Sequence, residues 1–169
     1  MVDNHKQRGD KEMLIRKFLE GEEQQLMDIF SSSIRENAKL YYNEDQLKAW
    51  APIEMDKNKW DERIRSINPY IIEDAGEILG YADLQVTGYI DHFFVKGGQA
   101  NRGVGSQLMN YILLQAKESN LNELTADVSL AAQALFEKFG FEVVKRKTVV
   151  IRGITLENAL MHKHIDSSK

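Results

Sequence analysis

Hydrophobic residues in the first third of the chain recur at the three- and four-residue spacing of a helix. The clearest series is Leu26, Ile29, Phe30 and Ile34, and it predicts an amphipathic helix over about residues 22–38. One stripe of this helix is apolar and the rest is polar, so we expect it to cover one face of a core.

Two shorter helices are indicated by signals at their ends. Asn43 and Gln46 have the spacing of a capping box, and the helix that they begin should end near Pro52, because proline cannot continue a helix. Apolar positions within residues 60–67 mark another helix, which should end before Pro69.

Beyond residue 70 the hydrophobic period shortens to that of strands. Runs rich in β-branched and aromatic residues, separated by glycine-containing turns, predict a series of strands, and a similar short run precedes the first helix. The predicted strands cover residues 13–18, 70–74, 78–86, 88–95, 121–128, 142–151 and 155–165. The last two should form a hairpin across the turn at Arg152 and Gly153.

Two further amphipathic helices lie between these strands. The first should span residues 103–119. The second should begin after Ser129, which is able to cap it, and end at Gly140, because glycine suits the left-handed position after a helix. The order of elements predicts a single α/β (α+β) domain over residues 13–166, with a mixed, mostly antiparallel sheet flanked by helices. Residues 1–12 and 167–169 should be mobile tails.

Composition narrows the classes of function. The net charge is −4 and basic residues are interspersed with acidic ones, which argues against nucleic acid as a partner. No cysteine is present, which excludes disulfides, cysteine zinc sites and an acyl-cysteine intermediate. No segment approaches the ~20 apolar residues of a membrane helix. We therefore expect a cytoplasmic protein with no membrane partner.

One glycine-rich turn joins a strand directly to a helix. Gly103 and Gly105 stand where the helix begins, and Arg102 precedes them. Free backbone N–H groups and the helix dipole favour an anion at such a place, and glycine lets the backbone approach a phosphate closely. A dinucleotide site of the Rossmann type is disfavoured, because Leu108 occupies the position of its third glycine.

The segment GYIDHFFVKGGQANRGVGSQLMNYIL, residues 88–113, resembles the acyl-CoA-binding motif of the GNAT N-acetyltransferase superfamily. The later segment SLAAQALFEKFGF, residues 129–141, is similar to the second signature of that superfamily. The order of elements is also similar over nearly the whole chain. The likeness implies the single-domain acyl-CoA N-acyltransferase fold, with acetyl-CoA as cosubstrate and no metal.

The resemblance implies a set of cofactor contacts. Backbone groups of Phe94 and Val95 should pair with the pantetheine amides, as a strand edge pairs with an added strand. Ser129 stands where the family often has an asparagine that reaches the cofactor, although it is equally suited to cap a helix. The pyrophosphate should rest on the N–H groups of Asn101, Arg102, Gly103, Val104, Gly105 and Ser106.

Two positions depart from the family pattern. Ala100 stands where the loop usually begins with glutamine or arginine, so we expect weaker side-chain contact but retained binding through the backbone. Phe136 should lie against the cofactor, where many members carry a tyrosine that protonates the departing thiolate. Phenylalanine cannot do this, and either another group takes the role or the thiolate leaves without it.

Candidates for the chemistry lie on the strand before the loop. Tyr89 and Asp91 should share one face of it, and His92 should point to the other, because side chains alternate. Asp91 is able to act as a base through a water, Tyr89 to position substrate or donate a proton, and His92 has the most suitable unperturbed pKa. The alternative for each of them is a structural role as a hydrogen-bonded residue of the strand. The N–H near Val95 is the expected partner of the oxyanion.

Substrate recognition should come from the early helical region. Tyr41, Tyr42, Trp50 and Trp60 make this stretch rich in aromatic residues, and the acidic residues 44–45 would attract a cation. Packing of the tryptophans onto the sheet is the alternative reading of the same pattern.

The sequence thus predicts acetyl transfer from acetyl-CoA to a primary amine by direct attack in a ternary complex, since no cysteine can carry the acetyl group. The acceptor would be a small molecule or a peptide amine. A non-catalytic acyl-CoA-binding or sensor module is the alternative, which Phe136 favours. The edge of the C-terminal hairpin would also allow a homodimer.

Overall fold

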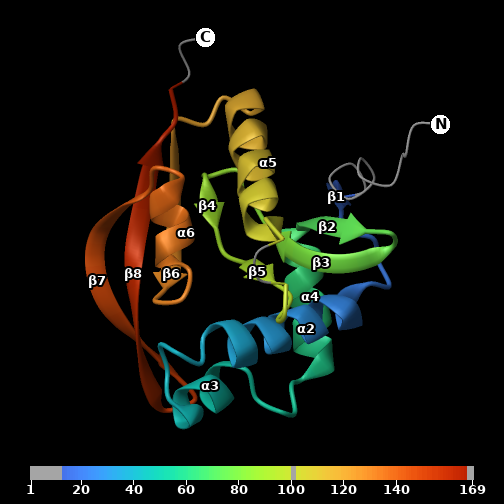
Figure 1. Ribbon diagram of the computed structural model, residues 1–169, viewed down its shortest axis with the longest axis vertical. Helices are drawn as coiled ribbons and strands as arrows, with labels where there is room; N and C mark the ends of the chain where they lie inside the picture. Colours follow the sequence, from blue (N-terminus) through green and yellow to red (C-terminus); the bar gives the residue numbers. More distant parts are fainter. Residues whose placement is uncertain (1–12, 100–101, 167–169) are drawn as a thin grey trace, which may run out of the picture.

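Two four-stranded sheets form the centre of the molecule (Figure 1), and the computed structural model describes residues 13–99 and 102–166. The first sheet is antiparallel throughout and has the strand order β1 (Met13–Lys17), β2 (Tyr70–Asp74), β3 (Glu77–Ala82) and β5 (Phe93–Val95). The second has the order β4 (Tyr89–Ile90), β6 (Glu123–Ser129), β8 (Ile154–His164) and β7 (Glu142–Ile151), and in it β4 and β6 are parallel.

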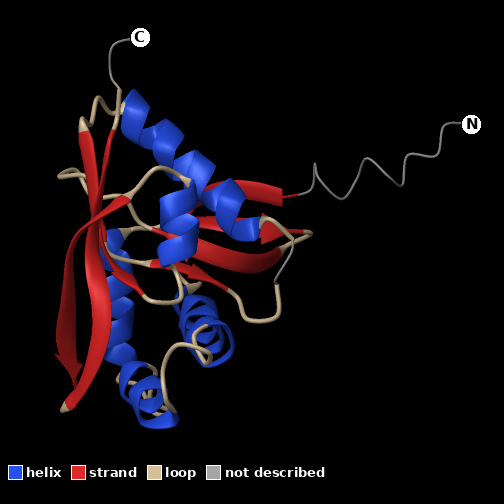
Figure 2. Ribbon diagram, turned by 60° about the vertical axis from the view of Figure 1, so that its left-hand side comes forward, coloured by secondary structure: helices blue, strands red, loops and turns tan. Residues whose placement is uncertain are grey.

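Helices cover both faces of the first sheet (Figure 2). Five α-helices and one π-helical segment, η2, are found within the described residues: α2 (Glu23–Ser32), η2 (Ser33–Asn37), α3 (Glu44–Trp50), α4 (Lys57–Ile67), α5 (Val104–Glu118) and α6 (Gln133–Lys138). The mixed, mostly antiparallel architecture flanked by helices is therefore confirmed. The predicted tails, residues 1–12 and 167–169, lie outside the described residues.

Alternation along the strands divides the core into two layers. Ile72 and Leu79 face α5, in a cluster that continues through the second sheet. Their neighbours Ile71 and Ile78, on the other face, pack against α2 and α4 together with Tyr81. Successive strand side chains point to opposite faces, so one short hairpin supports both layers at once.

Most of the predicted element ends are confirmed. Asn43 and Gln46 form the complete capping box, with hydrogen bonds in both directions. Gly140 has a φ of 91° just after α6. Arg152 and Gly153, with φ of 47° and 79°, make the turn between β7 and β8, because a tight hairpin turn needs two left-handed residues.

Four local predictions are wrong. The strand expected over residues 78–86 ends at Ala82. The helix expected over residues 22–38 becomes π-helical at Ser33. The helix expected to start at Ser129 begins at Gln133, and no side chain caps it. The strand expected over residues 88–95 is broken into β4 and β5, because residues 91 and 92 leave the ladder.

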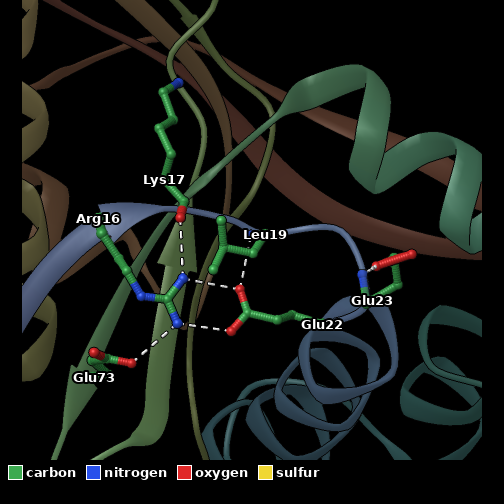
Figure 3. Close-up of polar contacts among 7 residues, drawn as sticks. Arg16, Lys17, Leu19, Glu22, Glu23 and Glu73 are labelled. Carbon is green, nitrogen blue, oxygen red and sulfur yellow. Dashed lines mark hydrogen bonds and ion pairs between the residues drawn. The ribbon is translucent and has the colours of Figure 1, made fainter.

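An arginine cluster joins the first strand to the first helix (Figure 3). Arg16 of β1 donates to both carboxylate oxygens of Glu22, at 3.0 and 2.7 Å, and to Glu73 of β2 at 3.1 Å. Glu22 also accepts the N–H of Leu19 at 2.8 Å. The hydrogen bond from Arg16 is the largest influence on the Glu22 carboxyl and holds its pKa below the usual value. This cluster fixes the angle at which α2 leaves the sheet.

Candidate active site

The two sheets diverge beside β5, and a cleft opens between them. Ile90 of β4 lies opposite Ala126 of β6, but β5 pairs with β3 alone among the described strands. A cavity of about 160 Å³ occupies the gap, and a larger one of about 500 Å³ lies on its other side. Trp50, Phe94 and Ser129 line both. The two cavities therefore meet where the sheets part.

The phase of β5 decides which backbone groups face the cleft. Lys96 donates its N–H to β3 at 2.8 Å, and the carbonyl of His92 accepts a bond of 3.1 Å from the residue after β3. Alternation in an antiparallel pair then directs the backbone of Phe94 toward β3 as well. The N–H and C=O groups of Phe93 and Val95 point to the cleft. The backbone groups available to pair with pantetheine amides on this strand are therefore those of Phe93 and not those of Phe94.

The π-helical segment η2 packs against the same edge. Asn37 donates from Nδ2 to the carbonyl of Val95 at 3.0 Å, and the N–H of Gly97 donates to Ser32 Oγ at 3.1 Å. A Cβ on Gly97 would lie 2.5 Å from a carboxylate oxygen of Glu36 and 2.8 Å from the Ser32 carbonyl. Glycine is thus required for the chain to turn this closely against the helix.

All three predicted catalytic side chains line the larger cavity. Tyr89, Asp91 and His92 share it, so the prediction that His92 points to the opposite face is wrong. The N–H groups of residues 91 and 92 both donate to one oxygen of Asp83, at 2.8 Å each. That arrangement breaks the regular alternation of the strand and turns consecutive side chains to the same side.

Asp91 stands at the centre of the polar groups in this cavity. Its carboxylate is hydrogen-bonded and ion-paired to Arg63 of α4. His92 Nε2 lies 3.6 Å from the same carboxylate oxygen. The arginine side chain is half exposed, whereas that of Asp91 is 19% exposed. The carboxylate is therefore oriented by these partners and reachable from the cavity.

His92 is held as a neutral ring. Burial lowers its pKa to about 4, against the opposing influence of the Asp91 charge. Its Nδ1 is 3.0 Å from the hydroxyl of Tyr81, a residue without solvent exposure. A buried hydroxyl needs an acceptor, and Nδ1 is the partner that the described residues give it, so we assign the ring proton to Nε2. His92 then directs an N–H toward Asp91 and is not the base.

A second carboxylate, which the sequence reasoning missed, faces Asp91 across the diverging strands. Asp127 follows Ala126 as Asp91 follows Ile90, so the parallel register brings both to the same cavity. It accepts from the Tyr89 hydroxyl at 2.9 Å and pairs with Lys147 at 2.5 Å. Burial, reinforced by this carboxylate, raises the pKa of Tyr89. The signal that was overlooked is the common register of two parallel strands.

The glycine-rich turn delivers free N–H groups at the start of α5. Gly103 has a φ of 73°, and the first helical bond runs from Gln107 back to its carbonyl. The N–H groups of Val104, Gly105 and Ser106 therefore lack partners within the helix. Together with the dipole of a 15-residue helix they provide donors of the kind that anions bind. The binding of a pyrophosphate at this turn stays a prediction. Asn101 lies outside the described residues.

Two cations flank this turn differently. Arg102, expected beside the anion, donates to Asp74 at 2.5 Å and to Gln99 at 2.7 Å. Lys138 of α6 donates to Ser106 Oγ at 3.2 Å. The sequence reasoning quoted this lysine within the second signature but gave it no role. Its ammonium is the cation aimed at the first turn of α5.

Close packing explains the second glycine of the turn. A Cβ on Gly105 would lie 3.1 Å from Leu135 of α6 and 3.6 Å from Val95 of β5. The residue thus lets α5 approach both elements, in addition to clearing space for a ligand.

Phe136 and Ser129 lie near the junction of the cavities. Phe136 is 2% exposed, and its ring stands edge-on to Phe93 at 5.5 Å and to Phe141 at 4.9 Å. It lines a smaller cavity of about 50 Å³, together with Asp91 and Ser129, and has no proton to donate there. Ser129 accepts a backbone bond from Ala132, so it lies before α6 instead of capping it. Its contact with the cofactor stays a prediction.

The predicted acceptor-binding aromatics divide into two groups. Trp50 lines both cavities, as expected for a residue beside substrate. Tyr42 lines the larger one, but its hydroxyl is engaged by the carbonyl of Glu157 at 2.5 Å and the N–H of Leu130 at 2.9 Å. Tyr41 is 51% exposed and does not line this cavity, and its contact with substrate stays a prediction.

Two features are absent from the described part of the chain. Within residues 13–99 and 102–166, no helix is both long and apolar enough to cross a membrane. The same residues contain no group of three or more histidine, cysteine, aspartate or glutamate side chains arranged to hold a metal ion.

Comparison with known proteins gives consistent matches. The model of the acetyltransferase (GNAT) domain family matches residues 38–159. An uncharacterized N-acetyltransferase of Escherichia coli, YafP, is 31% identical over 147 residues, which are 87% of this chain and 93% of that protein. A GCN5-related N-acetyltransferase from Rhodopseudomonas palustris superposes with a TM-score of 0.84 at 30% identity, covering 89% of this chain and 94% of that one.

More distant structures share the fold. A putative acetyltransferase from Salmonella typhimurium, solved with acetyl-CoA, has a TM-score of 0.66 at 16% identity and covers 93% of this chain and 96% of its own. An N-acetyltransferase from Thermoplasma acidophilum, solved with coenzyme A, has a TM-score of 0.70 at 15% identity and covers 90% and 98%. The family model matches more than half of the chain, and the Escherichia coli relative is 31% identical and covered over 93% of its length. This chain therefore belongs to the GNAT acetyltransferase family.

Proposed function

We propose that this protein transfers the acetyl group of acetyl-CoA to a primary amine by direct attack in a ternary complex. The observation that carries the proposal is the cleft between β5 and β6, whose edge offers the backbone groups of Phe93 and the N–H of Val95 and whose cavity adjoins a larger one. The smaller cavity suits an extended pantetheine arm, and the larger one suits the acceptor. Acetyl-CoA and coenzyme A in two proteins of the same fold support this.

The groups around the cleft fit the cosubstrate. The first-turn N–H groups of α5 and the ammonium of Lys138 match a pyrophosphate. The free edge of β5 matches the amides of pantetheine. Acetyl-CoA supplies an activated acetyl group: the amine nitrogen bonds to its carbonyl carbon while the C–S bond breaks and the electron pair leaves on sulfur.

Two groups of this chain would act directly on that transfer, the carboxylate of Asp91 and the N–H of Val95. Asp91 accepts the proton that the amine must lose, directly or through a water, while the Nε2–H of His92 and the Arg63 guanidinium hold its carboxylate in place. The N–H of Val95 donates to the charge that develops on the carbonyl oxygen. The apolar ring of Phe136 provides no acid, so the sulfur leaves as a thiolate, which is a tolerable leaving group.

The acceptor on this proposal is a small molecule or a peptide with a free amine. Aromatic side chains of Phe30, Trp60 and Phe94 form part of the larger cavity, and the carboxylates of Asp91 and Asp127 lie in its wall. An apolar body bearing an ammonium group fits such a surface.

One observation favours a second candidate, a non-catalytic acyl-CoA sensor of the same fold. Phe136 is buried against two other rings and has no polar atom, so this position provides no proton donor for the thiolate. A sensor needs the cleft and the anion site but not Asp91 at the junction.

A single experiment separates the two. Release of free thiol from acetyl-CoA is measured with a panel of arylalkylamines, polyamines, amino acids and short peptides, and binding of acetyl-CoA is measured by calorimetry. Amine-dependent thiol release supports the enzyme. Tight binding without release for any acceptor supports the sensor, and absence of binding rejects both.

A further inference from the structure

A buried carboxylate lies behind the break between β4 and β5. Asp83 directly follows β3, has no solvent exposure and does not line either cavity. Its Oδ1 accepts the N–H groups of Asp91 and His92, both at 2.8 Å, and its Oδ2 accepts from Gln85 at 3.1 Å. Its own N–H donates to the carbonyl of His92 at 3.1 Å. Four hydrogen bonds therefore converge on one residue.

The two bonds to Oδ1 determine the backbone path. In a regular strand, successive N–H groups point to opposite edges, so a single oxygen cannot accept both. Because Asp83 Oδ1 accepts both N–H groups, residues 91 and 92 leave the strand ladder. After this break β5 pairs with β3 and no longer runs beside β6, and the side chains of Asp91 and His92 enter the same cavity.

We propose that Asp83 is a positioning residue for acetyl transfer: through Oδ1 it sets the strand break that aligns the Asp91 carboxylate and the His92 ring with the acceptor cavity. The inference rests on the proposed function in that it concerns the same transfer. It concerns a residue that itself reaches neither substrate.

The surroundings of Asp83 agree with an acceptor role. Burial raises the pKa of its carboxyl, and the negative charge of Asp91 acts in the same direction, while the three donors oppose them. The other titratable groups that interact with it are Tyr81, Tyr89 and Lys17. An apolar side chain here would leave two buried N–H groups unpaired. What the position requires is an oxygen directed at both groups, and an amide oxygen would serve as well.

Two substitutions test this. Asp83→Asn keeps an oxygen for both N–H groups and removes the charge, so kcat should stay within about threefold of the wild type, with an unchanged pH profile. Asp83→Ser is too short to reach them, so kcat should fall roughly 10- to 100-fold, as expected for a misplacement of about 1 Å. The Kd for acetyl-CoA should change less than kcat in both, because the N–H groups at the start of α5 do not take part in the break.

Gln85→Ala is the matched control, since it removes a bond to Oδ2 alone, and kcat should remain within about twofold. Exchange of the Asp91 and His92 amide hydrogens should be slow in the wild type and in Asp83→Asn and fast in Asp83→Ser. This readout does not depend on turnover, so it tests the two hydrogen bonds to Asp83 Oδ1 even if no acceptor is acetylated.

The proposal is overturned if folded Asp83→Ser retains kcat within about twofold of the wild type. Should Asp83→Ser fail to fold, Asp83→Asn decides alone. A fall in kcat of tenfold or more, with normal acetyl-CoA binding, would then show that the charge acts and the geometry does not.

Discussion

Two arginine–carboxylate clusters in this molecule contain the same kind of ion pair but differ in their surroundings. Arg16 lies between Glu22 and Glu73, and the carboxylates are each 18% exposed. Arg63 pairs with Asp91 alone at the wall of a cavity, and its side chain is 49% exposed. In the first cluster the arginine and both carboxylates are engaged in contacts between parts of the fold. The second leaves its carboxylate facing space for a ligand.

The contrast shows what makes an ion pair functional. Residue types do not distinguish the clusters, because both pair a guanidinium with a carboxylate in favourable geometry. The difference is the neighbourhood of the carboxylate. Glu22 is surrounded by donors that belong to the fold, whereas Asp91 has a cavity of about 500 Å³ on one side. Changes at the first should therefore alter stability, and changes at the second should alter turnover.

The largest expected effect breaks the second cluster. Asp91→Asn removes the proposed base and keeps the backbone N–H that Asp83 binds, so kcat should fall about 100-fold or more. The free energy of unfolding and the Kd for acetyl-CoA should change little. Thiol-release assays measure kcat, urea denaturation measures the free energy of unfolding, and calorimetry measures the Kd. If kcat survives, Asp91 is not the base.

Breaking the first cluster should have the opposite profile. Arg16→Gln leaves two partly buried carboxylates without their cation, at a cost of about 2 kcal/mol in the free energy of unfolding, between the values for exposed and for buried pairs. Urea denaturation measures this cost, and kcat should be unchanged. Arg63→Gln is the matched control and should cost less than about 1 kcal/mol, because its pair is more exposed.

The pH dependence of stability should also separate the clusters. The pKa of His92 is lowered by burial to about 4, so the unfolded chain binds more protons than the fold between about pH 6.5 and 4. Stability therefore falls as pH drops through this window, on the order of 2 kcal/mol between pH 7 and pH 5. His92→Gln should remove that component, as urea titrations at both pH values would reveal.

Glu22 should act at lower pH. Its pKa is depressed, mainly by the hydrogen bond from Arg16, so its contribution is complete above the unfolded value and is lost as pH falls below it. The cost of Arg16→Gln should accordingly be smaller at pH 3 than at pH 7. An equal cost at the two values would contradict the assignment of the cluster's strength to ionised carboxylates.

The smallest expected effect concerns a third cation, Lys138. Lys138→Gln should weaken acetyl-CoA binding about two- to fivefold, the size of a charge effect at a helix N-terminus. Stability should not change measurably. Calorimetry at two salt concentrations is the measurement, since the difference should shrink as salt screens the ammonium. Lys117→Gln, at the other end of α5, provides a control.

Much of the fold follows from local patterns. The spacing of Leu26 and Ile29 placed the first helix, the capping box at Asn43 placed the start of α3, and Gly140 marked the end of α6. These signals are readable because each depends on residues within one or two turns of each other. The turn before α5 was readable for the same reason.

The active-site geometry was less accessible. His92 was assigned to the wrong face because the break in its strand depends on Asp83, which directly follows another strand, β3. Tyr41 was expected to line the substrate site because an aromatic run does not reveal which members turn outward. Asp127 and Lys138 were missed because their partners are 38 and 32 residues away in sequence.

The sequence by itself determined the helices, most of the strands, the anion-binding turn and the family resemblance, because these depend on short-range spacing and backbone preference. Only the tertiary structure decided which carboxylates share the larger cavity, which backbone groups face the cleft and which cation approaches the turn. These depend on contacts across diverging strands, where a change of one residue in register reverses the direction of a side chain.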